Sequence, residues 1–207
     1  GIESNTIVIF TSDNGGLSTS EGWPTSNLPL RGGKGWPYDG GVREPSIVKW
    51  PGVTKPGTTC EQPVISTDFY PTILQMAGLP LRPKQHVDGI SIVPALKEQT
   101  LPERPLFWHF PHYSNQGGGP EGAMREGDWK LVEWYDGDRV ELFNLKDDLG
   151  EQHNLASAQP EKTKALLSEF HDWRAAVGAQ MPTPNPKWGK LGKNRKAKSS
   201  TGKDDND

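Results

Sequence analysis

The segment TIVIFTSDNGG, residues 6–16, places the strongest constraint on how this chain folds. Residues 6–11 are a short apolar run that stops at turn residues, a pattern typical of a fully buried strand in an α/β sheet. Ligands of such sheets collect beyond the carboxyl ends of the strands, where Asp13 and Asn14 follow. Their carboxylate and amide oxygens are ligands that Ca²⁺ or Mg²⁺ prefers. An Asx turn followed by glycines explains the same residues, and the spacing does not match an EF-hand.

Glycines surround a single lysine in LRGGKGWPYDGGVREP, residues 30–45. Glycines let the backbone approach a ligand closely, and Lys34 would add a point charge that suits an oxyanion such as sulfate or phosphate. No Ser or Thr follows Lys34, so the segment is not a Walker loop, and a surface turn with a solvated lysine also explains it. Together with a metal held at residues 13–14, Lys34 would suit the hydrolysis of a sulfate or phosphate ester: the metal polarises the oxyanion, and the lysine neutralises developing charge.

Aromatic residues near these segments are candidates for substrate contact. Trp23, Trp36 and Tyr38 could form a stacking wall for a sugar ring, and ordinary loop packing explains them equally. His112 lies beside the glycine-rich segment SNQGGGPEG, and we interpret it as a substrate-binding residue. His109 is interpreted instead as a half-exposed histidine at an aromatic edge.

The pattern of predicted helices and strands in the 207-residue chain changes near residue 101. We predict an incomplete α/β domain over residues 1–100, a small α+β subdomain over residues 101–180 and a disordered basic tail over residues 181–207. In the first part, a second short strand is expected within residues 45–52 and a helix within residues 66–80.

In the second part, turn residues separate short segments that predict an antiparallel sheet, followed by one amphipathic helix. The expected strands are 105–110, 122–128, 129–135 and 139–145, and the helix is 160–177 with an apolar face of Leu166, Leu167, Phe170, Trp173 and Val177.

Charge and cysteine content exclude several classes of function. The formal net charge is −3, and residues 187–207 contain seven Lys/Arg and three Asp, so residues 1–186 carry −7. That sign does not fit nucleic-acid binding, and no apolar span or leader indicates a membrane partner. The single cysteine, Cys60, excludes an internal disulfide and a cysteine-based zinc site, and we interpret it as a semi-buried thiol.

The motifs have a family-like order along the chain: TIVIFTSDNGG, LRGGKGWPYDGGVREPSIVKWPG, STDFYPTILQMAGLP, HVDGISIVPAL, REGDWKLVEWY and ELFNLKDDLGEQHNL. Over roughly residues 2–178 this order resembles the C-terminal part of a type I, formylglycine-dependent sulfatase (arylsulfatase) of the alkaline-phosphatase superfamily. The resemblance implies an α/β fold, namely the C-terminal portion of an alkaline-phosphatase-like fold followed by an α+β subdomain. It also implies hydrolysis of a sulfate ester, with a sulfated small molecule or polysaccharide as substrate, in the periplasm or outside the cell.

The resemblance assigns roles to individual residues. Asp13 and Asn14 would be two ligands of one Ca²⁺ ion, and Lys34 would be catalytic, contacting the sulfate and the ester oxygen. The family nucleophile is a cysteine in a Cys-x-Pro-x-Arg context, oxidised to formylglycine, and Cys60 lacks that context. We therefore expect the nucleophile and the other metal ligands in an N-terminal half of the same protein, and this fragment alone to be inactive. A phosphodiesterase or phosphonate hydrolase of the same superfamily, a non-catalytic sugar-binding module and a pseudoenzyme remain alternatives.

Overall fold

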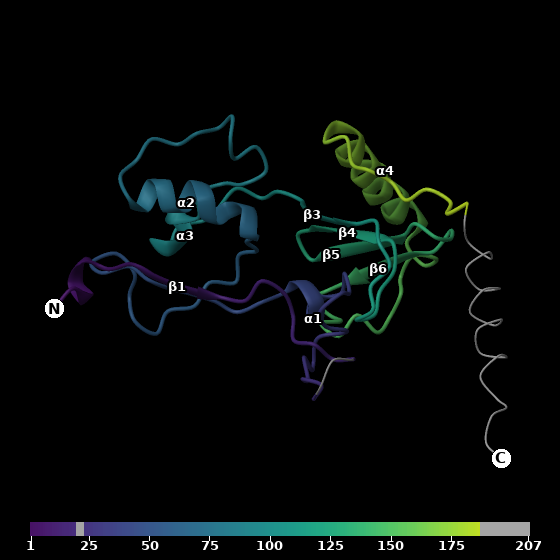
Figure 1. Ribbon diagram of the computed structural model, residues 1–207, viewed down its shortest axis with the longest axis horizontal. Coiled ribbons are helices and arrows are strands. Elements are labelled where there is room, and N and C mark those ends of the chain that lie inside the picture. Colours follow the sequence, from purple (N-terminus) through teal and green to yellow (C-terminus); the bar gives the residue numbers. More distant parts are fainter. Residues whose placement is uncertain (20–22, 187–207) are drawn as a thin grey trace, which may run out of the picture.

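Two antiparallel strands near the start of the chain extend away from the four-stranded sheet and α4 (Pro160–Ala176), on the same side of the molecule as α2 (Phe69–Met76) and α3 (Val93–Leu96) (Figure 1). The computed structural model describes residues 1–19 and 23–186. After the 3-10 helix η1 (Glu3–Asn5), β1 (Val8–Thr11) pairs with β2 (Ser46–Lys49). The strand expected within residues 45–52 is thus confirmed. Of the tail expected over residues 181–207, residues 187–207 lie outside the described residues.

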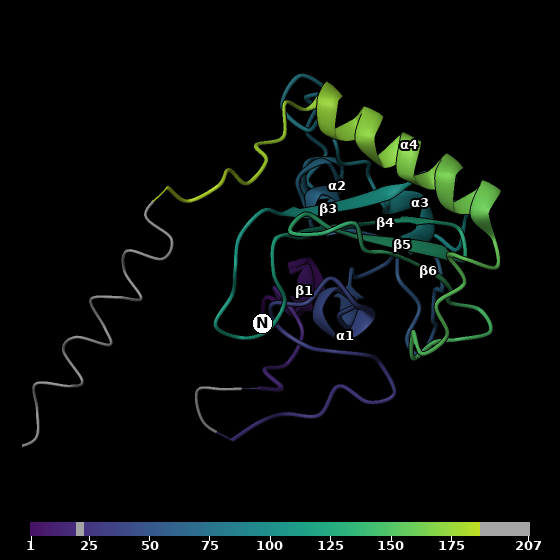
Figure 2. The same ribbon diagram turned by 90° about the vertical axis from the view of Figure 1, so that its right-hand side faces the viewer.

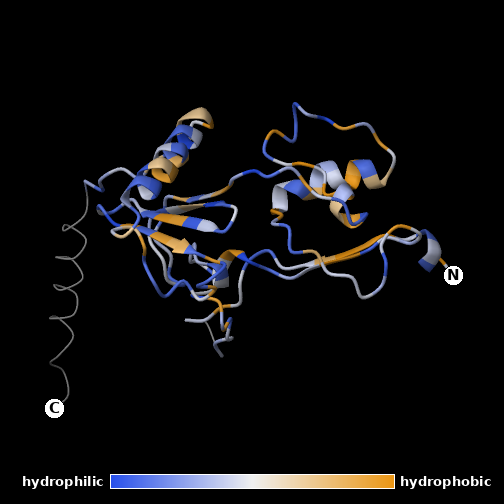
Figure 3. Cartoon of the chain, turned by 180° about the vertical axis from the view of Figure 1, so that it is seen from behind, coloured by the Kyte–Doolittle hydropathy of each residue, from blue (hydrophilic) through white to orange (hydrophobic). Residues whose placement is uncertain are grey.

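The expectation that the first strand is fully buried is wrong for this chain. Val8 is 50% exposed, Phe10 61% and Ile47 62%, although both strands are strongly apolar (Figure 3). The reason is that β1 has β2 as its single sheet neighbour within the described residues, and only Ile9 and Val48 of the two strands are half-buried.

The helix expected within residues 66–80 forms as the 3-10 helix η2 (Ser66–Asp68) and α2 (Phe69–Met76). Asp68 is buried and fixes this start, because its two carboxylate oxygens accept hydrogen bonds from the Ile65 and Ile90 amides at 2.9 Å each. A short helix, α3 (Val93–Leu96), lies beside α2 (Figure 1).

The second part is a four-stranded antiparallel sheet in the order β3-β4-β5-β6, which confirms the predicted sheet. Its strands are β3 (Leu106–Phe110), β4 (Glu121–Glu126), β5 (Trp129–Trp134) and β6 (Val140–Asn144). The helix α4 (Pro160–Ala176) follows as predicted, and no helix of the described residues is long and apolar enough to cross a membrane.

One face of this sheet packs against α4 (Figure 2). Its core consists of Met124, Leu131 and Leu142, which share one cross-strand row, together with Leu166 and Phe170 of the helix. Leu167 and Trp173 complete the predicted helix face, but Val177 is 49% exposed because the helix ends before it.

The opposite face of the sheet carries the glycine-rich loop and α1 (Asp39–Val42) (Figure 2). Here Ala123, Val132, Trp134 and Phe143 enclose Tyr38, which is 2% exposed. The sheet therefore has α4 on one side and the predicted anion-binding loop on the other, and this arrangement positions the candidate site.

Candidate functional site

Backbone hydrogen bonds join the turn after β1 to the glycine-rich segment of residues 30–45, which contains Lys34 and is called the Gly-Lys loop below. The Gly15 amide donates to the Gly41 carbonyl at 3.0 Å, and the Lys34 amide donates to the Gly16 carbonyl at 3.2 Å. A Cβ atom on Gly15 would lie 1.8 Å from the Gly40 oxygen, so a side chain there cannot fit. The two motifs singled out in the sequence are therefore in direct contact, and their glycines permit it.

The sheet holds this loop through buried polar contacts. The Tyr38 hydroxyl donates to Glu141 Oε2 at 2.6 Å, and the Arg31 guanidinium lies 3.8 Å from the centre of the Tyr38 ring. Burial, followed by the bond to Glu141, raises the pKa of Tyr38 well above its usual value. Tyr38 is thus a core residue, and the alternative that it stacks on a sugar ring is wrong because its ring is enclosed.

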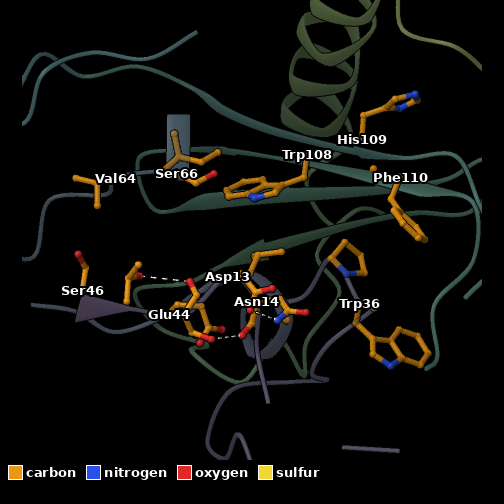
Figure 4. Close-up of a pocket in the computed structure, with 18 of the residues that line it drawn as sticks. Asp13, Asn14, Trp36, Glu44, Ser46, Val64, Ser66, Trp108, His109 and Phe110 are labelled. Atoms are coloured by element: carbon orange, nitrogen blue, oxygen red, sulfur yellow. Dashed lines mark hydrogen bonds between the residues drawn. The ribbon is translucent and has the colours of Figure 1, made fainter. Parts of the chain in front are cut away.

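A cavity of about 390 Å³ lies between the strand pair and the four-stranded sheet. Asp13 and Asn14 form part of one wall, and Trp108 on β3 lies across from them, with Trp36 and Phe110 to one side (Figure 4). Other lining residues come from β2, η2 and β4: Ser46, Ser66, Glu121 and Gly122. The cavity thus combines an oxygen-rich wall with aromatic rings, a combination typical of small-molecule sites.

The oxygen-rich wall suits a hard divalent cation. Asn14 Nδ2 donates to Asp13 Oδ1 at 2.7 Å, which leaves the amide oxygen of Asn14 and the second oxygen of Asp13 as possible donors to a metal. Glu44 also lines the cavity, and its pKa is raised by burial first and then by the negative charge of Asp13. The wall is thus acidic, and a cation would relieve the repulsion between these carboxylates.

These donors do not make a complete metal cage. No group of three or more His, Cys, Asp or Glu side chains able to hold a metal occurs within the described residues. Since Ca²⁺ takes six to eight oxygen ligands, Asp13 and Asn14 would supply only part of its coordination.

The structure does not bring every predicted residue into the cavity. Gly35 lines it, whereas Lys34 is half-buried next to it and forms no ion pair with the described residues. His112 is exposed, with its ring 5.5 Å from the ring of Phe110, and Trp23 is 98% exposed. The roles of Lys34 and His112 in substrate contact therefore stay predictions.

His109 belongs to the cavity lining, but its ring points away from Asp13 and Asn14, toward α4 (Figure 4). Its ring nitrogens contact the Tyr135 hydroxyl at 2.8 Å and the Gln180 carbonyl at 2.9 Å. These contacts give His109 a structural role in joining the sheet to the chain after α4.

Sequence reasoning did not find Glu121, a carboxyl group in the cavity lining that is only 1% exposed. The available signal was an acidic residue directly before the apolar segment that was expected to begin at Gly122. The turn residues before it made Glu121 look like part of a solvated loop.

Comparison with known proteins identifies the family. The family described as N-sulphoglucosamine sulphohydrolase, C-terminal, matches residues 33–175. The chain belongs to the sulfatase family. The matched region includes most of the Gly-Lys loop, the four-stranded sheet and nearly all of α4, so these elements are the C-terminal elements of a sulfatase.

Similar sulfatases are considerably longer than this chain. A sulfatase of Formosa agariphila is 43% identical over 202 residues, which cover 92% of this chain and 36% of that protein. The crystal structure of Ps i-CgsB superposes with a TM-score of 0.71 at 28% identity, covering 95% of this chain and 42% of that one. BT4656, solved with its substrate D-glucosamine-2-N,6-O-disulfate, has a TM-score of 0.63 at 25% identity, covering 83% and 34%. These matches confirm the alkaline-phosphatase-like sulfatase fold.

Proposed function

We propose that the whole protein to which this chain belongs hydrolyses a sulfate ester on a carbohydrate. The observation that carries the proposal is the direct backbone contact between the Asp13-Asn14 turn and the Lys34 loop, beside an aromatic cavity, in a chain of the sulfatase family. The chain spans a little over a third of the Formosa agariphila sulfatase, so the activity is proposed for the longer protein.

A sulfated sugar is supported by the chemistry of the cavity and by the relatives. Trp36 and Trp108 offer faces for the apolar side of a sugar ring, and carboxyl and amide groups nearby can bind its hydroxyls. BT4656 was solved with a sulfated glucosamine, and Ps i-CgsB was solved with k-i-k-neocarrahexaose. Both comparisons favour a carbohydrate over a simple aryl ester.

We assign Asp13 and Asn14 as two ligands of a Ca²⁺ ion, because both are hard oxygen donors that face the cavity. When bound, the ion supplies positive charge to the sulfate oxygens. Lys34 would place its ammonium group near the same oxygens and the leaving oxygen, and His112 would donate a hydrogen bond to the substrate.

Cys60 does not fit the family nucleophile. It is exposed rather than semi-buried, in a loop that does not line the cavity, and it is followed by Glu61, Gln62 and Pro63. The formylglycine residue would therefore be supplied from outside these residues, in the longer protein.

The test measures sulfate release by the complete protein, from sulfated saccharides and from a nitrophenyl sulfate, before and after calcium removal with EGTA. We expect Lys34→Ala to lower kcat/KM about 10²- to 10³-fold, as for loss of a group that stabilises developing charge. Asp13→Ala should abolish calcium binding measured by calorimetry. The exposed Lys146 offers a control, and Lys146→Ala should stay within about twofold.

Other outcomes separate the alternatives. Hydrolysis of phosphodiesters or phosphonates without sulfate release would indicate a different activity on the same fold. Binding of a sulfated saccharide without turnover would indicate a non-catalytic module. Unchanged turnover in Lys34→Ala would contradict the role assigned to the lysine.

A further inference from the structure

A buried carboxyl group without a full set of partners lies in the cavity. Glu121 begins β4, is 1% exposed and belongs to the cavity lining. Its Oε2 atom is buried and has no hydrogen-bond partner among the described residues. The Gly119 amide hydrogen-bonds the carboxyl group, and Gly118 leaves room for it, since a Cβ there would lie 2.6 Å from Oε1. One oxygen is thus held by the fold, and the other has no partner among the described residues.

Such a group destabilises the fold, because burying a polar atom without a hydrogen bond is unfavourable by about 1–3 kcal/mol. Other buried carboxylates of this chain are compensated by a cation: Lys130 Nζ lies within 3.0 Å of two of them. No cation is paired with Glu121 in that way among the described residues. A carboxyl oxygen without a partner, in a residue that lines a cavity, points to a binding role for that residue.

The neighbours of Glu121 favour a sugar as the ligand. Phe110 is its cross-strand partner on β3, and Trp36 and Trp108 line the same cavity. Aromatic rings pack against the C–H face of a pyranose, and a carboxyl group at the edge of the ring bonds a hydroxyl. Asp13 and Asn14, the proposed sulfate end of the site, line the cavity as well.

We propose that Glu121 is a specificity residue of this site, whose carboxyl group hydrogen-bonds a hydroxyl group of the sugar that carries the sulfate. This inference rests on the proposed function, and it names the part of the substrate that the four-stranded sheet recognises. Glu121 acts on the alcohol part of the ester, whereas Asp13, Asn14 and Lys34 act on the sulfate.

The protonation state of the Glu121 carboxyl group suits a position near the sulfate of the substrate. Burial is the main cause that raises the pKa of Glu121 to about 8. The Gly119 amide and Arg139 oppose the shift, Asp136 and Glu141 add to it, and Asp13 and Glu44 line the same cavity. At neutral pH the carboxyl group is therefore mostly protonated, so it donates a hydrogen bond and does not repel the sulfate.

The test compares two substrates in the complete protein: a sulfated monosaccharide and a nitrophenyl sulfate that has no sugar hydroxyls. Glu121→Leu removes the hydrogen bond at similar volume, and Glu121→Gln keeps a donor that cannot ionise. We expect Glu121→Leu to reduce the ratio of kcat/KM for the sugar over the aryl ester about 10- to 100-fold, and Glu121→Gln to change it less than about threefold. Glu126→Leu, on the same strand but exposed, is the control and should leave the ratio unchanged.

The pH dependence gives a second readout. For the wild type, kcat/KM on the sugar sulfate should fall as the pH rises through about 8, relative to the aryl ester, whereas Glu121→Gln should show no such fall. Equal losses on both substrates, or no loss in Glu121→Leu, would overturn the role of Glu121 while leaving the proposed function intact. Absence of sulfate release from either ester by the wild type would overturn the proposed function, and the inference with it.

Discussion

Lys130 Nζ lies 2.6 Å from Asp39 Oδ1, and both side chains are almost completely buried. Glu151 Oε1 lies 3.0 Å from the same nitrogen, and the other oxygen of Glu151 accepts the Asp39 amide at 2.7 Å. Arg43 approaches Asp39 from the solvent side at 3.7 Å. This contact joins β5 to α1 and therefore joins the sheet to the loop that contains Lys34.

Replacement of Lys130 by Met should loosen that loop, because Asp39 and Glu151 would lose the buried cation between them. Arg43 pairs with Asp39 alone, from the solvent side. Breaking a buried pair from one side is unfavourable by about 3–5 kcal/mol. Hydrogen–deuterium exchange of peptides covering residues 30–45 should therefore become faster by about tenfold or more. Lys146→Met, at an exposed position, is the control, and equal exchange in both variants would contradict a supporting role for Lys130.

Gly15→Ala should displace the turn that presents Asp13 and Asn14. The added Cβ would lie 1.8 Å from the Gly40 oxygen, so the turn or α1 has to move. We expect calcium affinity to fall about tenfold or more, measured by calorimetry on the complete protein. Gly137→Ala, where no atom lies within 4 Å of the added carbon, should bind calcium as the wild type does. Wild-type affinity in Gly15→Ala would show that the turn does not hold the ion.

Glu121→Gln should stabilise the protein in a pH-dependent way. The pKa of Glu121 is about 8 in the fold against 4.5 in the unfolded chain, so the native state binds the extra proton between these values. Wild-type stability contributed by this group therefore falls as the pH rises from 4.5 to 8, by at most about 1.4 kcal/mol per unit. The Tm of Glu121→Gln should match the wild type near pH 5 and exceed it near pH 8. A Tm difference between Glu121→Gln and the wild type that shrinks as the pH rises would contradict the raised pKa of Glu121.

Phe170→Ala should loosen α4 from the sheet. Phe170 is fully buried, and its ring stacks near those of Phe107 and Trp173, with centroids 6.2 and 5.8 Å away. Removing such a ring reduces the free energy of unfolding by about 3–5 kcal/mol, which urea titration followed by tryptophan fluorescence would measure. Ser168→Ala, two residues away on the exposed side of α4, should change it by less than about 0.5 kcal/mol.

Local patterns in the sequence were sufficient for most elements. The β5–β6 hairpin and the bounds of α4 follow from a Gly-containing turn and from Pro160 at the first helical position, both of which act within a few residues. Burial of β1 was predicted wrongly because an apolar run does not reveal whether a second layer covers it. The predicted domain boundary at residue 101 separates α1 from the four-stranded sheet, although α1 packs against that sheet in the structure.

The composition of the site was harder to predict than its position. Asp13 was found because hard-metal ligands follow a strand end, a relation within one motif. Glu121 and the core position of Tyr38 depend on contacts between distant segments, such as the bond from Tyr38 to Glu141 across 103 residues. A single sequence carries no direct record of such pairs.

The Asp39–Glu151 bond spans 112 residues of chain, which bears on the order of folding. The sheet and α4 use mostly contacts between neighbours in sequence, whereas closing this long loop has an entropy cost that grows with its length. During synthesis the Gly-Lys loop leaves the ribosome more than a hundred residues before Glu151 does. The Gly-Lys loop can therefore reach its final position only after β6 and the residues that follow it have been made. The candidate site is completed late in the folding of this chain.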